Sequence, residues 1–243
     1  MNRNPRYERQ ILMPEIGPEG QLRLSGSRVV VFGLGGLGCS AAAALALAGV
    51  GDILIVDYDL VEPSNLNRQY LHWPRDIGHL KVESAVNKLQ AMNPDIHIMG
   101  IRSRVGRDNI MDILTGVDVM VDALDNFPAR FVLNMAAYHA GIPLVHGACR
   151  GFEGHITTLV PQRTPCLKCL FRESPPEEIC QVIGITPMLI GTLQAAEAVK
   201  LLLGLEGGLW GRMLHFDCLS MTSREIKLER DPDCSVCGRG RAR

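Results

Sequence analysis

The chain has 243 residues, 47% of them hydrophobic, and a formal net charge of −1 at pH 7. This length suits one large domain or two small ones, and a nearly neutral chain creates no long-range field for nucleic acid or an anionic membrane. The N-terminus is polar from its first residue, and no stretch offers about 20 uninterrupted apolar residues. We therefore expect a cytoplasmic protein without nucleic-acid or membrane partners.

Short apolar runs alternate with helical patterns over the first 150 residues. In chain order, the sequence predicts strand 29–32, helix 39–48, strand 53–56, helix 81–92, strand 97–101, helix 108–115, strand 117–121, helix 128–139 and strand 144–146. Gly49, Gly116 and Gly141 follow three of these helices, as is typical of helix C-terminal ends. The alternation predicts right-handed crossovers and a Rossmann-like α/β fold, whose mainly parallel sheet carries helices on both faces.

The pattern changes at about residue 151. Three further strands are predicted at 156–160, 213–216 and 223–228, with one long helix, 188–203, after the first of them. We expect these strands to form an antiparallel C-terminal portion. Because no segment has the composition of a linker, we expect a single domain over 1–243, made of a Rossmann-like part at about 26–150, a second part at about 151–238 and a basic tail at 239–243.

A glycine-rich turn follows the first predicted strand. Gly33, Gly35 and Gly38 fit the pattern G-x-G-x-x-G, and Gly36 is a fourth glycine in the same turn. Between a strand and a helix, this pattern lets backbone N–H groups approach a phosphate at the helix N-terminus. Asp57 lies 19 residues after Gly38, at the end of the next strand, where a carboxylate can accept hydrogen bonds from ribose hydroxyls. Together these features predict a nucleotide site.

The charged residues around this site favour ATP over NAD. Asn65, Arg68 and Gln69 come just after the second strand, and Lys81 begins the following helix. A displacement at the α-phosphate of ATP develops negative charge on pyrophosphate, and fixed cations stabilise that charge. Asp125 follows a strand that ends at the same edge of the sheet, where a carboxylate can hold Mg²⁺.

Two Cys-x-x-Cys pairs lie in the C-terminal part. Cys166 and Cys169 form one pair, and Cys234 and Cys237 form the other. Four thiolates complete a tetrahedral zinc site with no open position, so we expect a structural zinc ion that ties the C-terminus to the loop at 161–170. The alternative is a thioredoxin-like redox pair, which would open a helix after a strand.

The motifs in combination resemble the ThiF/MoeB/HesA family, the bacterial relatives of ubiquitin-activating enzymes. The resemblance extends from residue 6 to residue 238. It is carried by RYERQ (6–10), GLGGLG (33–38), DYDLVEPSNLNRQ (57–69), KVESA (81–85), LDN (124–126) and the paired cysteines. Members of this family adenylate the C-terminal glycine of a small ubiquitin-like sulfur carrier protein, so the resemblance implies ATP, Mg²⁺ and Zn²⁺ as the cofactors. It also implies that the part at about 151–238 binds the carrier and zinc.

The resemblance also implies a role for individual residues. Asp57 is expected to bind ribose, and Gly36 to lie against the nucleotide. Three residues are expected to contact the phosphates: Asn65, Arg68 and Lys81. Asp125 is expected to serve Mg²⁺, and the family's zinc ligands correspond to Cys166, Cys169, Cys234 and Cys237.

Two further roles depend on the resemblance. Arg9 is expected to reach across a homodimer into the partner subunit's ATP site. Cys180 follows a polar stretch, 172–179, at a position where some family members carry a cysteine for sulfur transfer. This sequence reads CQVIGITP, whereas many relatives have an alanine-glycine pair soon after the cysteine. The sequence therefore leaves two interpretations of Cys180: a catalytic thiol or a dispensable one.

The resemblance and the residues agree on an ATP-dependent adenylyltransferase that activates a carrier ending in Gly-Gly. Two alternatives remain: an NAD-dependent oxidoreductase, which shares the glycine turn, and a non-catalytic scaffold that binds a ubiquitin-like protein. The sequence carries no rhodanese-like segment, so we expect a separate protein to donate sulfur. It does not choose among carriers for thiamine, molybdopterin or another sulfur-containing product.

Overall fold

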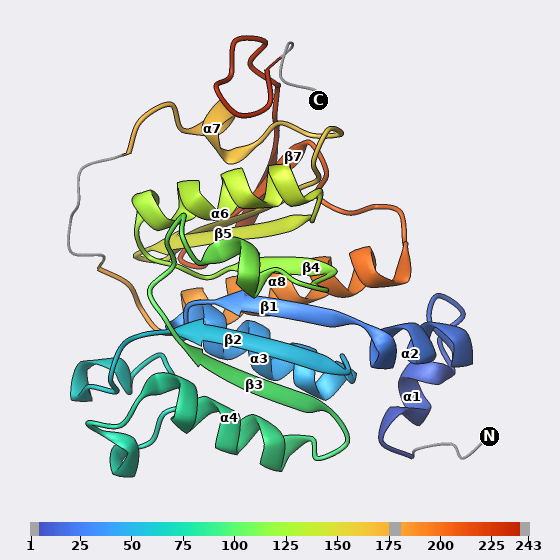
Figure 1. The fold of residues 1–243 in the computed structure, drawn as a ribbon, viewed down its shortest axis with the longest axis vertical. Coiled ribbons are helices and arrows are strands. Elements are labelled where there is room, and N and C mark those ends of the chain that lie inside the picture. Colours follow the sequence, from blue (N-terminus) through green and yellow to red (C-terminus); the bar gives the residue numbers. More distant parts are fainter. Residues whose placement is uncertain (1–4, 175–180, 239–243) are drawn as a thin grey trace.

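A single eight-stranded sheet forms the centre of the computed structural model, which describes residues 5–174 and 181–238 (Figure 1). Its order is β3-β2-β1-β4-β5-β6-β7-β8. The strands are β1 Arg28–Phe32, β2 Asp52–Asp57, β3 His97–Arg102, β4 Val119–Asp122, β5 Leu144–Arg150, β6 Glu153–Leu159, β7 Arg212–Asp217 and β8 Thr222–Lys227. Neighbours among β1–β5 pair in parallel, and β6, β7 and β8 add antiparallel pairs. The predicted α/β class with an antiparallel C-terminal portion is confirmed.

Helices cover both faces of this sheet. They are α1 Glu8–Ile11, α2 Gly17–Gly26, α3 Gly36–Ala48, α4 Lys81–Met92, α5 Ile110–Ile113, α6 Phe127–Ala140, α7 Leu167–Leu170 and α8 Ile185–Leu203, with short 3-10 turns η1 Pro5–Tyr7, η2 Pro63–Asn65 and η3 Pro74–Asp76. Val29 and Val31 of β1 pack in a core with α3, α4 and α8, whereas Val30 and Phe32 pack in a second core with α5, α6 and α7. Successive side chains of β1 point to opposite faces of the sheet, so this strand contributes residues to both cores.

Several boundaries differ from the predictions, each for a local reason. Helix α3 begins at Gly36 because the glycine turn itself forms the first helical turn. Pro187 lies in the first turn of α8, where a missing N–H costs nothing, so this helix starts before the predicted residue 188. Helix α5 has only four residues, because the Asn109 side chain bonds the backbone of Gly106 and Arg104 and holds the preceding residues in a turn.

The predicted helix ends are confirmed at Gly49 and Gly141, which adopt the left-handed conformation with φ of 84° and 72°. Helices α1 and α2 were not predicted. Contacts with distant residues hold them: Gln10 of α1 and Gln21 of α2 both donate to the Ala48 carbonyl oxygen, at 3.0 and 3.1 Å. Within the described part of the chain, no helix has the length and apolarity that crossing a membrane demands.

Candidate active site and zinc site

The glycine turn lies at the carboxyl ends of β1, β2 and β4, and two of its glycines are fixed by close approach. Gly33 has φ of 93°, and a Cβ there would lie 2.7 Å from the Ala123 carbonyl oxygen. A Cβ on Gly38 would lie 1.8 Å from the Gly33 carbonyl oxygen, so no other residue fits. The turn therefore packs directly against the segment that follows β4, and the N-terminus of α3 opens toward this edge of the sheet.

Asp57 ends β2 and is 8% exposed. Its Oδ2 accepts the Leu34 N–H at 2.7 Å, and its Oδ1 accepts the Asp59 N–H at 2.8 Å. Burial raises the pKa of this carboxyl, and the positive charge of Lys81 opposes that rise. Each carboxylate oxygen has a second lone pair, so Asp57 can shape the glycine turn and still accept a hydroxyl from a ribose. The sequence did not predict its contact with Leu34.

The segment after β2 folds back against the glycine turn. Gly36 approaches the Arg68 carbonyl oxygen, since a Cβ on Gly36 would lie 3.3 Å from it. Gln69 is buried beside Gly35, and its Oε1 has no hydrogen-bond partner. Asn65 is also buried, and its Oδ1 accepts the Glu62 N–H at 3.0 Å. An unpartnered buried amide oxygen at a glycine cradle fits a site that receives a polar ligand.

The two predicted phosphate cations differ in their surroundings. Arg68 is half-buried, and its guanidinium donates to the Ser64 carbonyl oxygen at 2.8 Å. Lys81 is 6% exposed, and its Nζ lies 2.9 Å from Asp59 Oδ2. The partner of Lys81 was not predicted, although Asp59 stands only two residues after Asp57. This carboxylate holds the ammonium group in place at the first turn of α4.

Asp125 is exposed in the loop between β4 and α6. Its Oδ1 accepts from Asn126 Nδ2 at 3.3 Å, and the Asn126 side chain caps α6 by accepting the Ala129 N–H. Its carboxylate is thus available to a cation at the same sheet edge as the glycine turn. An exposed carboxylate beside a phosphate cradle fits Mg²⁺ delivered with a nucleotide.

Arg9 lies far from the glycine turn of its own chain. The next residue, Gln10, donates from Nε2 to the Ala48 carbonyl oxygen at 3.0 Å, at the C-terminal end of α3. Gly36 begins this helix of 13 residues, and at 1.5 Å per residue its two ends are about 18 Å apart. Arg9 is exposed, so its side chain can reach a neighbouring molecule.

Cys180 and the basic tail at 239–243 lie outside the described residues. The described chain resumes at Gln181, whose carbonyl oxygen accepts the Gly151 N–H at 2.6 Å. Gly184 then packs against Asn67, since a Cβ there would lie 2.3 Å from the Asn67 carbonyl oxygen. The start of α8 therefore packs against the segment that carries Arg68.

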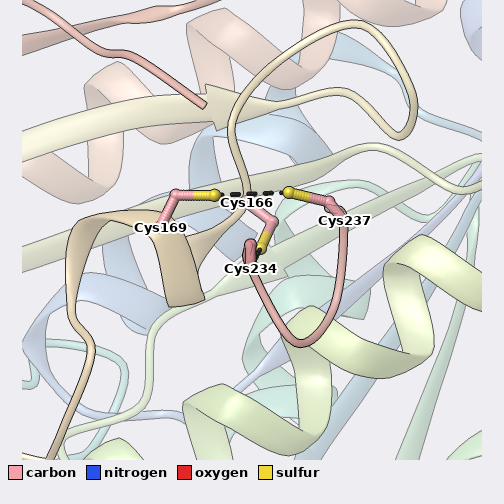
Figure 2. Close-up of side chains that lie close together, drawn as sticks. All are labelled: Cys166, Cys169, Cys234 and Cys237. Carbon is pink, nitrogen blue, oxygen red and sulfur yellow. Dashed lines mark hydrogen bonds between the residues drawn. The ribbon is translucent and has the colours of Figure 1, made fainter. Parts of the chain in front are cut away.

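The four predicted zinc ligands come together between α7 and the C-terminal segment, where Tyr138 of α6 packs against them (Figure 2). All four sulfurs lie within 4.8 Å of one another, with 3.6 Å between Cys166 and Cys234 and 3.3 Å between Cys169 and Cys237. A tetrahedral zinc–thiolate site has sulfur–sulfur separations of about 3.8 Å. The predicted four-cysteine cluster is confirmed, and its geometry fits a structural zinc ion.

A metal ion would change the ionisation of these thiols. Burial raises the pKa of Cys166 to about 11 and also raises that of Cys237. The pKa of Cys234 is lowered, because the effect of its burial is outweighed by backbone N–H groups of Cys237 and Val236. A bound Zn²⁺ would keep all four sulfurs as thiolates.

Comparison with known proteins places these sites in a family context. The model of the ThiF family matches residues 7–236. The SAMP-activating enzyme E1 of Haloferax volcanii is 48% identical over 241 residues, which cover 97% of this chain and 89% of that protein. The sulfur carrier protein adenylyltransferase of Thermus thermophilus is 42% identical over 244 residues, covering 96% and 90%. The adenylyltransferase and sulfurtransferase MOCS3 of Mus musculus is also 42% identical, but this chain spans 52% of its length.

Solved structures of Escherichia coli MccB share the fold. The structure with MccA-N7isoASN superposes with a TM-score of 0.86 at 23% identity, covering 98% of this chain and 75% of MccB. The structure with ATP superposes with a TM-score of 0.84, also at 23% identity, covering 97% and 75%. At this identity, the likeness concerns the fold alone.

Proposed function

The chain belongs to the ThiF family, and from this we propose that it is an ATP-dependent adenylyltransferase for a small ubiquitin-like sulfur carrier protein. The observation that carries the proposal is the identity of 48% and 42% to two carrier-activating relatives over nearly the whole of each chain. The reaction would join the C-terminal glycine carboxylate of the carrier to AMP and release pyrophosphate.

The site supports this chemistry through placement and charge. The glycine carboxylate is ionised near neutral pH, so it can attack the α-phosphorus without a protein base. An oxygen–phosphorus bond forms as the bond to pyrophosphate breaks, and Arg68 and Lys81 stabilise the charge that develops on the leaving group. Asn65 and the turn at Gly36 orient the phosphates, while Asp57 accepts a ribose hydroxyl. Magnesium, held by Asp125, would neutralise further phosphate charge.

Carrier-dependent exchange of labelled pyrophosphate into ATP tests the proposal. We expect exchange with a carrier that ends in Gly-Gly and none with the same carrier lacking its last glycine. ATP, and not NAD, should raise the melting temperature of the protein, because ligands stabilise the folded state that binds them. Binding of a candidate carrier without any exchange would identify a scaffold instead, and protection by NAD would identify an oxidoreductase.

The proposal includes partners beyond the carrier. We infer a separate sulfur-donor protein and a cytoplasmic location, and both remain predictions from the sequence. We also infer a homodimer. Around Arg9, the N-terminal elements and the end of α3 expose three leucines that a second copy would cover: Leu12 at 76%, Leu22 at 73% and Leu47 at 51%.

A complementation experiment tests the role of Arg9 across this dimer. If the guanidinium of Arg9 completes the partner subunit's site, mixing inactive Arg9→Ala and Arg68→Ala proteins should restore exchange. In a mixed dimer, one of the two sites has both arginines. Statistical mixing makes half of the dimers mixed, so we expect about a quarter of the wild-type rate per dimer. No recovery, when native mass spectrometry has shown that subunits mix, would place any action of Arg9 within its own chain.

Cys180 separates two routes for sulfur. In a covalent route, the Cys180 thiolate would attack the acyl-adenylate, form a thioester with the carrier and release AMP. In a direct route, the external donor would attack the acyl-adenylate and release AMP. We expect Cys180→Ser to keep pyrophosphate exchange in either route, because adenylation needs no thiol. If the route is covalent, this variant should lose formation of the carrier thiocarboxylate, measured by mass spectrometry with a sulfur donor present. A wild-type yield would assign the direct route.

A further inference from the structure

The loop that carries Asp125 is attached to the protein through buried ionic groups that the proposed mechanism does not use. Asp122, at the end of β4, has no exposed surface, and Arg130, in the first turn of α6, is 6% exposed. The guanidinium Nε lies 3.8 Å from Asp122 Oδ2. Burying two charges is costly, so such a pair is expected where it supplies something that an apolar pair cannot.

The pair holds both backbone groups of Leu124, the residue before Asp125. Asp122 Oδ1 accepts the Leu124 N–H at 3.1 Å. Arg130 donates from a terminal guanidinium nitrogen to the Leu124 carbonyl oxygen, and the same nitrogen lies 3.5 Å from the Gly147 carbonyl oxygen on β5. Since the N–H and the C=O are both fixed, the chain direction into Asp125 is fixed as well.

Two other side chains support this arrangement from opposite faces of the sheet. His146, which is fully buried, donates from Nδ1 to Asp122 Oδ2 at 2.7 Å. Gln194 of α8 donates from Nε2 to the Asp122 carbonyl oxygen at 2.7 Å. Arg130 also stacks over the ring of Phe127, 5.3 Å from its centroid. The side chain of Arg130 is therefore committed to the protein interior and is not itself available as a phosphate ligand.

We propose that Arg130 and Asp122 are positioning residues for Asp125: the pair fixes Leu124 so that the Asp125 carboxylate is held ready for the magnesium of Mg·ATP. This inference rests on the proposed function, in which Asp125 serves Mg²⁺. The variants of the pair should need more Mg²⁺ for exchange but approach the wild-type rate when Mg²⁺ is saturating. Mutation of a residue that orients a metal ligand typically lowers the metal affinity by about 10- to 100-fold.

Arg130→Lys is the first test variant because it keeps the positive charge opposite Asp122, whereas a single ammonium group cannot reach all the partners of the guanidinium. We expect the Mg²⁺ concentration for half-maximal exchange to rise about tenfold. Asp122→Asn is the second variant. Its amide can still accept from His146, but it then presents N–H donors to the Leu124 N–H. It should shift the Mg²⁺ dependence in the same direction.

Asn134→Ala is the matched control. Asn134 lies on the same helix as Arg130 and is 2% exposed, but its Oδ1 accepts the Leu167 N–H at 2.7 Å, on the zinc side. This variant should lower the melting temperature without changing the Mg²⁺ dependence. An equal shift in Asn134→Ala would mean that any loosening of α6 has the effect, and the proposal would be wrong.

A double variant shows whether the pair acts through Asp125. Adding Arg130→Lys to Asp125→Ala should produce no further rise in the Mg²⁺ requirement, since coupled residues are not additive. Additive shifts, or wild-type Mg²⁺ dependence in both Arg130→Lys and Asp122→Asn, would overturn the proposal. Binding of Mn²⁺ with ATP, followed by electron paramagnetic resonance, provides the same comparison without turnover. It keeps this test separate from the adenylation test if the wild-type protein proves to catalyse no exchange.

Discussion

Removal of zinc should release the C-terminal segment and strongly destabilise the protein. We expect about one zinc ion per chain in freshly purified protein, because the four sulfurs around α7 form a closed thiolate site. The cluster connects residues 166–169 to residues 234–237, beyond β8, which ends at Lys227. Four-cysteine sites contribute roughly 10 kcal/mol or more of apparent binding energy in small zinc domains.

Chelation followed by thermal unfolding measures this effect. The melting temperature should fall, and a protease should then cleave near 228–238 before it cleaves the sheet. Cys234→Ser should reproduce the result, whereas Cys218→Ser, a cysteine outside the cluster, should not. The zinc effect should weaken as the pH falls, because protons compete with the metal for the thiolates. Metal analysis that finds no zinc in fresh protein would contradict this prediction.

The central sheet could be predicted because its signals are local. Apolar runs such as 53–56 and 144–146 closely follow glycines that end helices, and these glycines, Gly49 and Gly141, adopt the backbone conformation that this position requires. The N-terminal helices could not be predicted in the same way. Helix α2 contains three glycines and only two leucines, and it is placed by contacts that span the chain, such as the approach of Gly20 to Leu203.

The candidate site shows a similar division. Residue types and spacing were enough to place Asp57 and Asp125 at one edge of the sheet, because the carboxyl ends of parallel strands meet there. The pairing of side chains at this edge could not be predicted from the sequence. The ion pair of Lys81 with Asp59 joins residues 22 positions apart, and Asp57 supports the glycine turn through the Leu34 N–H. The burial of Arg130 could not be predicted, because a charged residue in an amphipathic helix normally faces solvent.

Loss of the positive charge of Arg68 or of Lys81 should nearly abolish carrier-dependent pyrophosphate exchange. Arg68→Ala removes the guanidinium of a half-buried residue that belongs to none of the hydrophobic cores. Lys81→Met keeps most of the buried aliphatic stem and removes only the charge, so the packing of α4 should survive. Removing one group that stabilises developing charge costs on the order of 3 kcal/mol, which corresponds to at least a hundredfold loss in rate. The exchange rate at saturating ATP and carrier is the quantity to measure.

Matched variants separate this effect from a loss of fold. Lys88→Met is the control for Lys81→Met: Lys88 lies on the same helix at 8% exposure, but its Nζ pairs with Asp76 at 2.5 Å and not with Asp59. We expect it to lower stability, since it leaves Asp76 without its cation, while exchange stays within about threefold of wild type. Arg75→Ala, an exposed arginine of η3, is the control for Arg68→Ala. Near-normal exchange in both Arg68→Ala and Lys81→Met would remove these cations from the mechanism and leave phosphate stabilisation to the glycine turn and Mg²⁺.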